Sequence, residues 1–183
     1  ISMNSFQEFD TVFRRVFLLL TDASADLLKG VMEFNIQLIE TIEEKHDSIT
    51  KFISYCLRLL NKYGYPDHKK TTMLYHILAT LDRIADVLKN VARDLLKFKH
   101  NLNDRTIQLF ATIDKNIKIL SDFFFKFESH KATELYKDRN EVLNLLYKYK
   151  NKIPADELIL LSKMEHVLEL LNDIQVTRMG IEY

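Results

Sequence analysis

The sequence predicts an all-α protein built from two tandem three-helix bundle repeats, with six long antiparallel helices in total. Apolar residues recur at steps of three and four along almost the whole chain, which is the spacing of one buried helical face. Glycine and proline are rare, with three and two among 183 residues, whereas all-β and α/β proteins need many turns. Long helices with short connections pack as antiparallel bundles.

The first half of the chain contains three expected helices. The first covers about residues 5–31 and carries a row of phenylalanines, and the second covers about residues 34–62. Gly64 and Pro66 follow, and they end the second helix in a turn. The third helix covers about residues 69–99.

The second half contains three more expected helices. Asn103 or Asp104 can cap the fourth helix, because both side chains accept hydrogen bonds from free backbone N–H groups. Pro154 lies near the first turn of the sixth helix, a position that tolerates its missing N–H. The expected ranges are about residues 104–127 and 130–151, and then a sixth helix that ends at Gly180.

The two halves repeat one order of elements: helix, short join, helix, Pro-containing turn, helix. This repetition divides the chain into a first repeat, residues 1–99, and a second repeat, residues 100–183. The chain begins with ISMN, so it is also read as an excerpt from a longer protein.

Composition and charge exclude several functional classes. The 26 basic and 26 acidic residues balance, which argues against binding nucleic acid or an anionic membrane by bulk charge. No apolar run reaches the roughly 18 residues of a membrane span, and no signal peptide is recognised. The single cysteine, Cys56, falls on an apolar seam and fits a cytoplasmic, reducing location. No GxGxxG, P-loop or nucleophile with a base supports an enzyme.

Pairs of acidic residues one helical turn apart recur in both halves. Like charges at this spacing weaken a helix by a few tenths of a kcal/mol. Four pairs take matching places, on the second and third helices of each half: Glu43/Asp47, Asp82/Asp86, Glu134/Asp138 and Glu169/Asp173. Three further pairs are Asp22/Asp26, Glu40/Glu44 and Glu165/Glu169.

Two neighbouring helices that each present such a pair would form a cluster of four carboxylates on the bundle surface. Hard cations such as Mg²⁺, Mn²⁺, Ca²⁺ or iron prefer these ligands, and a bound cation turns the repulsion into attraction. The alternative is a solvated face, on which Arg83, Lys89 and water neutralise Asp82 and Asp86.

The acidic segments resemble those of the PhoU-like phosphate uptake regulators, and the resemblance covers nearly the whole chain. LDRIADVLKNVARDL is similar to the third-helix motif of that family, and IEEKHDSI to its partner motif. KATELYKDRNEV and LELLNDIQ take the same places in the second half, and CLRLLNKYGYPDHKKT resembles the archaeal branch. The sequence departs from the family at Asp82, where Glu is usual, and at Leu170 and Asn172, where Arg and a small residue are usual.

The resemblance implies a cytoplasmic, dimeric adaptor that is not an enzyme and that restrains phosphate uptake by contact with a phosphate transporter or a sensor kinase. It also implies surface-bound metal ions, here Fe, Mn, Zn or Mg. In the mechanism we expect, metal bound by the first repeat ties its second and third helices together and shapes a docking surface. The expected metal ligands are Glu43, Asp47, Asp82, Asp86, Glu134, Asp138, Glu169 and Asp173.

Two other functions are considered. In the first, the chain is the sensing and dimerising half of a transcriptional regulator whose DNA-binding domain precedes Ile1. In the second, it is a di-iron enzyme. Those bundles use Glu-x-x-His motifs in their core, whereas His166 precedes Glu169 in the wrong order, and the acidic pairs are judged to lack such histidines.

Two apolar features leave alternatives open. His46 lies on the apolar seam of the second helix, either as a core residue or reaching toward a metal held by Glu43 and Asp47. The consecutive Phe123, Phe124 and Phe125 span about 200° of a helix and cannot all face one core. We interpret them as buried between the two repeats, the alternative being a dimer or transporter contact.

Overall fold

The computed structural model describes residues 3–182, and the side chains of residues 6–149 and 151–182. This part of the chain is helical, without strands, which confirms the all-α prediction. The elements are α1 (Met3–Glu33), α2 (Ile36–Tyr63), α3 (His68–Leu95), α4 (Asp104–Phe125), α5 (Ser129–Tyr149), the 3-10 turn η1 (Lys150–Lys152) and α6 (Ala155–Glu182).

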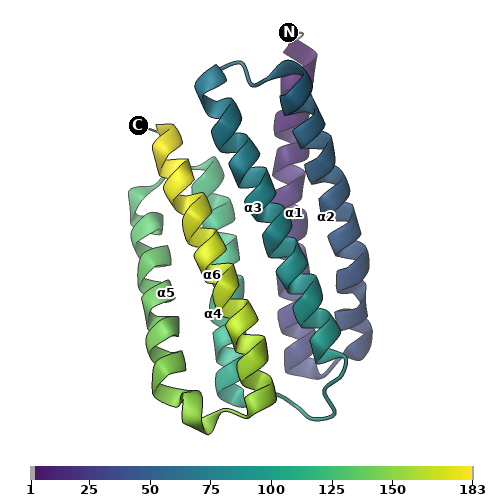
Figure 1. Ribbon diagram of the computed structural model, residues 1–183, viewed down its shortest axis with the longest axis vertical. Coiled ribbons are helices and arrows are strands. Elements are labelled where there is room, and N and C mark those ends of the chain that lie inside the picture. Colours follow the sequence, from purple (N-terminus) through teal and green to yellow (C-terminus); the bar gives the residue numbers. More distant parts are fainter. Residues whose placement is uncertain (1–2, 183) are drawn as a thin grey trace.

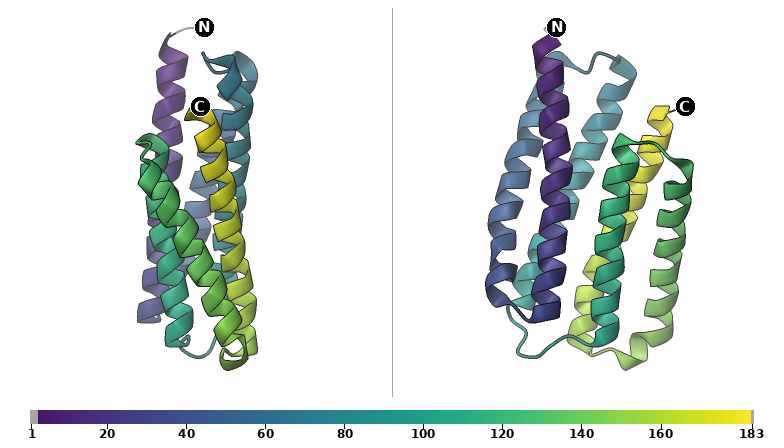
Figure 2. Two further views of the ribbon diagram at one scale, coloured as in Figure 1. Left: turned by 90° about the vertical axis from the view of Figure 1, so that its left-hand side faces the viewer. Right: turned by 180° about the vertical axis from the view of Figure 1, so that it is seen from behind.

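The helices form two groups of three that stand side by side (Figure 1). Helices α1, α2 and α3 pack on one another, as do α4, α5 and α6, and the groups meet where α3 packs on α6 and α1 packs on α4. Figure 2 shows the same two groups from the side and from behind. The boundary between the predicted repeats falls in the connection after α3, and the independence of the two groups as domains stays a prediction.

Buried phenylalanines join the two groups. Phe124 of α4 packs on Phe13 and Phe17 of α1, with ring centroids 5.3 and 4.9 Å apart. Phe125 also reaches Phe17, at 5.1 Å, whereas Phe123 turns toward Phe127 at 5.2 Å. The interpretation of this run as buried between the repeats is therefore correct for Phe124, whereas Phe125 touches α1 but is only partly buried.

Most helix ends follow the predicted signals. Gly64 caps α2 with a φ of 67°, and its N–H bonds to Leu60 O; this left-handed conformation favours glycine. Asn103 caps α4, with its side chain accepting from Arg105 N. Between α1 and α2, Asn35 is the residue that caps the second helix.

Two helix ends differ from prediction. Helix α3 stops at Leu95 rather than near residue 99, because the backbone tightens into a turn in which Phe98 N bonds to Leu95 O at 3.0 Å. Helix α6 continues past Gly180 to Glu182. Glycine weakens a helix by about 1 kcal/mol without having to end it, and the Arg178–Glu182 ion pair supports this last turn.

Two further predictions concern the interior and the membrane. Cys56 is fully buried, as predicted, and burial raises the pKa of its thiol to about 12. Within residues 3–182, none of the helices has the length and apolar character needed to cross a membrane. The DNA-binding domain that the alternative function requires before Ile1 lies outside the described residues.

Candidate functional site

The carboxylates predicted in the first repeat lie along one seam between α2 and α3. The two helices run antiparallel (Figure 1), so that the start of α2 meets the end of α3. Glu43 of α2 is bonded to Arg93 of α3, and Thr50 of α2 donates a 3.1 Å hydrogen bond to Asp82 of α3. The structure therefore places both predicted pairs of this repeat on the same seam.

His46 lies in the middle of the α2/α3 seam, where only 11% of its side chain is exposed. Its Nε2 is 2.9 Å from Asp86 Oδ1 and 3.0 Å from Lys89 Nζ, and its Nδ1 is 3.2 Å from Asp47 Oδ1. The apolar spacing correctly placed His46 near the core. Two of its polar partners, Asp86 and Lys89, come from α3, which the pattern of α2 alone could not identify.

Basic side chains of α3 form hydrogen bonds with two of the four predicted carboxylates of the first repeat, Glu43 and Asp86. Arg93 Nε donates to Glu43 at 2.9 Å, and this hydrogen bond lowers the pKa of Glu43. Lys89 Nζ lies 2.7 Å from Asp86 and lowers the pKa of that carboxyl, against the opposing effect of partial burial. The seam therefore already contains positive charge at the points where its carboxylates meet.

The carboxylates predicted in the second repeat are divided between two seams. Glu134 and Asp138 of α5 face α4, where Lys115 Nζ lies 2.9 Å from each of them. On the other side of α5, Arg139 donates hydrogen bonds of 3.0 and 2.6 Å to Glu169 of α6. The structure therefore does not gather the carboxylates of this repeat into one cluster.

Whether these residues fit a metal ion depends on how many of their oxygen and nitrogen atoms converge on one point. Mg²⁺ and Ca²⁺ need six or more oxygen ligands around one point. Among residues 3–182, no three His, Cys, Asp or Glu side chains are placed to hold one ion, and Asp173 is exposed one turn beyond Glu169. As arranged, the residues do not fit Fe, Mn, Zn or Mg. Metal binding stays a prediction.

One Glu-x-x-His spacing does occur in the chain, from Glu43 to His46, and the argument from sequence against a di-iron enzyme overlooked it. The structure directs the two side chains to different partners, Glu43 to Arg93 and His46 to Asp86. Both lie on a seam at the surface, whereas di-iron bundles place their ligands in the core.

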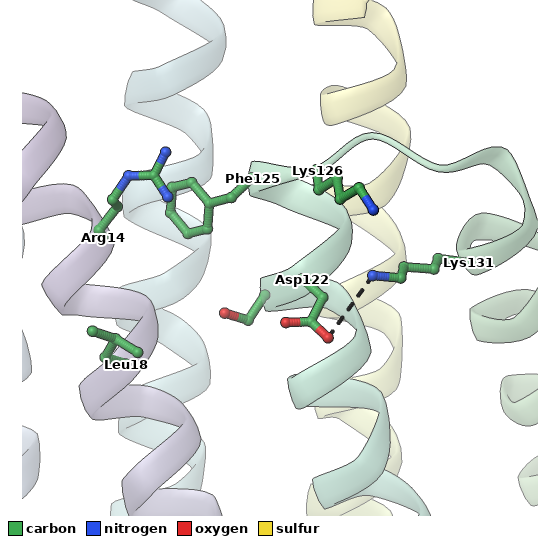
Figure 3. A pocket seen from close by; sticks show the side chains of 7 residues that line it. Arg14, Leu18, Asp122, Phe125, Lys126 and Lys131 are labelled. Carbon is green, nitrogen blue, oxygen red and sulfur yellow. Dashed lines mark ion pairs between the residues drawn. The ribbon is translucent and has the colours of Figure 1, made fainter.

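A surface pocket of about 440 Å³ lies between α1 and α4 (Figure 3). The guanidinium carbon of Arg14 lies 4.2 Å from the centroid of the Phe125 ring, so the two side chains form one wall by a cation–π contact. Across the pocket, Lys131 lies 3.8 Å from Asp122. The remaining lining residues are Leu18, Ser121 and Lys126. The pocket offers an apolar wall and charges of both signs.

A second pocket, of about 200 Å³, shares Arg14 and Phe125 with the first. It contains Asp10 and Tyr65, whose hydroxyl donates a long, 3.4 Å hydrogen bond to the Asp10 carboxylate. Burial raises the pKa of Asp10, and it raises the pKa of Tyr65 to about 12. Arg178, also in this wall, is bonded to Phe124 O at 2.8 Å. The polar groups of this pocket are therefore largely engaged within the fold.

Sequence reasoning missed both pockets. One signal was available, because the phenylalanine run of α4 is followed by Lys126 and the phenylalanine row of α1 is interrupted by Arg14. The pairing of these two rows depends on how α1 meets α4, which periodicity along one helix does not specify.

Comparison with known proteins identifies the fold. No family model and no curated protein sequence matches the chain. The structure is similar to the crystal structure of the phosphate transport system regulatory protein PhoU from Streptococcus pneumoniae, with a TM-score of 0.81. The match covers 97% of this chain and 94% of that chain, at 15% sequence identity. The chain therefore has the PhoU-like fold that its acidic motifs implied.

Proposed function

We propose that the chain is a regulator of phosphate uptake and phosphate homeostasis, acting as a helical adaptor on a phosphate transporter or its sensor kinase. The observation that carries this proposal is the match in fold along nearly the whole length of both chains, to a protein whose name is that of a phosphate transport regulator. The recurrence of acidic motifs in matching places supports it independently. In this proposal the chain works in the cytoplasm, as a dimer and without catalysis.

The α2/α3 seam is the surface we propose for the partner. Asp47 and Asp86 are about half exposed or more, with 64% and 49% of their side chains accessible. Carboxylates in this position can meet basic residues of a partner, and complementary charge across an interface contributes specificity and association rate. The buried part of the same seam, His46 and Lys89, holds these carboxylates in place.

Deletion of the coding sequence from its host tests the proposed function. We expect deletion to raise the uptake of radiolabelled phosphate in phosphate-rich medium, and the intact chain, supplied again, to restore the lower rate. The variant Asp47→Lys should fail to restore it. Glu44→Lys, which changes an exposed acid about 100° around the same helix from Glu43, should succeed. Uptake that does not respond to deletion would contradict the proposal.

The proposed dimer has its own test. Light scattering of the purified chain during size-exclusion chromatography is expected to give twice the mass of one chain. The mass of a single chain at all protein concentrations would contradict the dimer. The proposed regulatory function would then be tested by the phosphate-uptake experiment alone.

A further inference from the structure

Lysines bridge two of the acidic pairs whose spacing predicts repulsion. Lys45 of α2 is bonded to both Asp22 and Asp26 of α1, at 2.5 Å from Asp26. Lys115 of α4 lies 2.9 Å from both Glu134 and Asp138 of α5. An ammonium group has three donors on one charged centre, so a single lysine can bond two carboxylates at once.

The two bridges take corresponding places in the two groups of helices. Each joins the first and second helices of its group, α1 with α2 and α4 with α5. The lysine and the acidic pair have exchanged helices between the groups. In the first group the lysine is on the second helix, and in the second group it is on the first.

Arginine–glutamate pairs show the same correspondence at the next junction. Arg93 of α3 is bonded to Glu43 of α2, and Arg139 of α5 is bonded to Glu169 of α6. Each pair joins the second and third helices of its group, again with donor and acceptor exchanged. Consecutive helices within each group are therefore joined by at least one basic side chain that bonds to an acid of the neighbouring helix.

We propose that the side chains of Lys45, Lys115, Arg93 and Arg139 take the place of metal ions on the acidic faces of the helices. Each forms an ion pair between two helices, called a clamp here, and the chain needs no bound metal. The acidic pairs are then retained as acceptors for these clamps. This inference concerns the faces themselves and does not depend on the proposed function.

Burial and electrostatics support these clamps. The Asp138 side chain is 13% exposed and Lys45 is 21% exposed, so both are screened less than charges in open solvent. The hydrogen bonds that Lys115 donates to Glu134 and Asp138 raise the pKa of this lysine. Burial lowers the pKa of Lys45, yet the bonds to its two aspartates outweigh that effect and raise it. Both lysines therefore remain charged at neutral pH.

The test compares four forms of the full chain: wild type, Lys115→Met, Glu134→Gln/Asp138→Asn, and all three changes together. Metal content is measured by plasma mass spectrometry, and Tm is measured with EDTA, with Mg²⁺ and with Mn²⁺. Lys137→Met, which removes an exposed lysine of α5, is the matched control.

We expect wild type to contain far less than one metal ion per chain and to keep its Tm in EDTA, Mg²⁺ and Mn²⁺. Lys115→Met should lower Tm by about 1–4 °C, because Glu134 and Asp138 lose their ion pairs with the lysine and then repel each other. Mn²⁺ should recover part of that loss, and so should the added Glu134→Gln/Asp138→Asn changes. Lys137→Met should keep the wild-type Tm.

Two results would overturn the proposal. One is a stoichiometric metal ion in wild type that is lost, together with stability, in EDTA or in Glu134→Gln/Asp138→Asn. The other is a Tm of Lys115→Met that does not differ from that of Lys137→Met.

Discussion

Glu157 places a carboxylate in the interior of the molecule, where only 1% of its surface is exposed. Its two oxygens lie 3.1 and 3.2 Å from Asn103 N, and it also accepts the hydroxyl of Thr106. These donors lie at the start of α4, where backbone N–H groups have no partner within the helix. A negative charge also interacts favourably with this end of the helix dipole. Glu157 thus fastens α6 to the beginning of α4.

Replacing Glu157 by alanine is expected to lower the free energy of unfolding by about 2–3 kcal/mol, because the partly buried N–H of Asn103 and the buried hydroxyl of Thr106 lose a charged acceptor. Urea denaturation followed by circular dichroism measures this loss. Asp173→Asn, an exposed change on the same helix, is the control and should be nearly neutral. A loss from Glu157→Ala no larger than that of the control would contradict the assigned role.

His100 makes a second tie between the connection after α3 and the start of α6. Its Nδ1 lies 3.0 Å from Asn101 O and its Nε2 lies 3.1 Å from Asp156 Oδ2. Both ring nitrogens face acceptors, which favours the doubly protonated imidazolium. The bond to Asn101 O, and then the bond to Asp156, raise the pKa of His100 above its ordinary 6.5.

This pKa shift predicts a pH dependence with a definite sign. A histidine whose pKa is raised by folding stabilises the folded state fully below pH 6.5, and the contribution is lost as the pH rises through the folded-state pKa. Unfolding free energies of wild type and His100→Gln should therefore differ most in mildly acid solution and converge as the pH rises above the folded-state pKa. A difference that grows with pH would reverse the sign and contradict the assignment.

Gly30 and Gly180 are both helical glycines, and they predict opposite responses to alanine. A Cβ at Gly30 would lie 2.6 Å from Ile39 Cγ1, because α1 and α2 approach closely there, whereas a Cβ at Gly180 would meet only Met73 Cε, at 4.0 Å. Gly30→Ala is expected to cost about 1–3 kcal/mol of stability by overpacking. Gly180→Ala is expected to gain up to about 1 kcal/mol from helix propensity.

Thermal unfolding of the two glycine variants side by side measures this contrast. Adding Ile39→Ala to Gly30→Ala removes the clashing carbon, so the two changes together should cost less than the sum of their separate effects. Equal stabilisation by both alanines would show that α1 and α2 can separate at Gly30 without loss.

The helices could be predicted from sequence because apolar spacing is a local property of each segment. The end of α2 at Gly64 and the cap of α4 at Asn103 are likewise local signals. The continuation past Gly180 was missed although the i,i+4 spacing of Arg178 and Glu182 is itself a local signal. The end of α3, in contrast, was not predictable in this way, because it depends on contacts beyond the segment. Phe98, for example, packs against the core after the helix has ended.

The candidate site could be predicted only in part, for a related reason. Spacing correctly identifies which acidic residues share one face of one helix, as with Glu134 and Asp138. It does not identify the neighbour that this face meets, which is α4 with Lys115 rather than α6 with Glu169. The buried role of Glu157 was missed because its partner Asn103 lies 54 positions away in the chain.

The whole molecule is held together by packing between its two groups of helices. Phe124 of α4 is 8% exposed and fills the space against Phe13 and Phe17 of α1. At the other contact, Lys163 of α6 is bonded to Asp94 of α3. Because domain interfaces of this kind are often the first to open, the strength of this packing decides whether the groups unfold together.

Phe124→Ala is expected to cost about 3–5 kcal/mol and to separate the unfolding of the two groups. The single cysteine, Cys56, is a built-in reporter for the first group, because it is fully buried there and burial raises its thiol pKa to about 12. Thiol labelling therefore follows α1–α3 alone, while circular dichroism follows all the helices.

In wild type the labelling and dichroism transitions in urea should coincide, as in two-state unfolding, whereas in Phe124→Ala they should separate. Phe123→Ala is the matched control, since Phe123 is fully buried but packs on Phe127 within the second group. It should cost similar stability and keep the two transitions together, because the contact with α1 remains. Coincident transitions in Phe124→Ala would mean that α3 and α6 hold the groups together without the phenylalanine cluster, and the cooperativity of the fold would then have to come from that second contact.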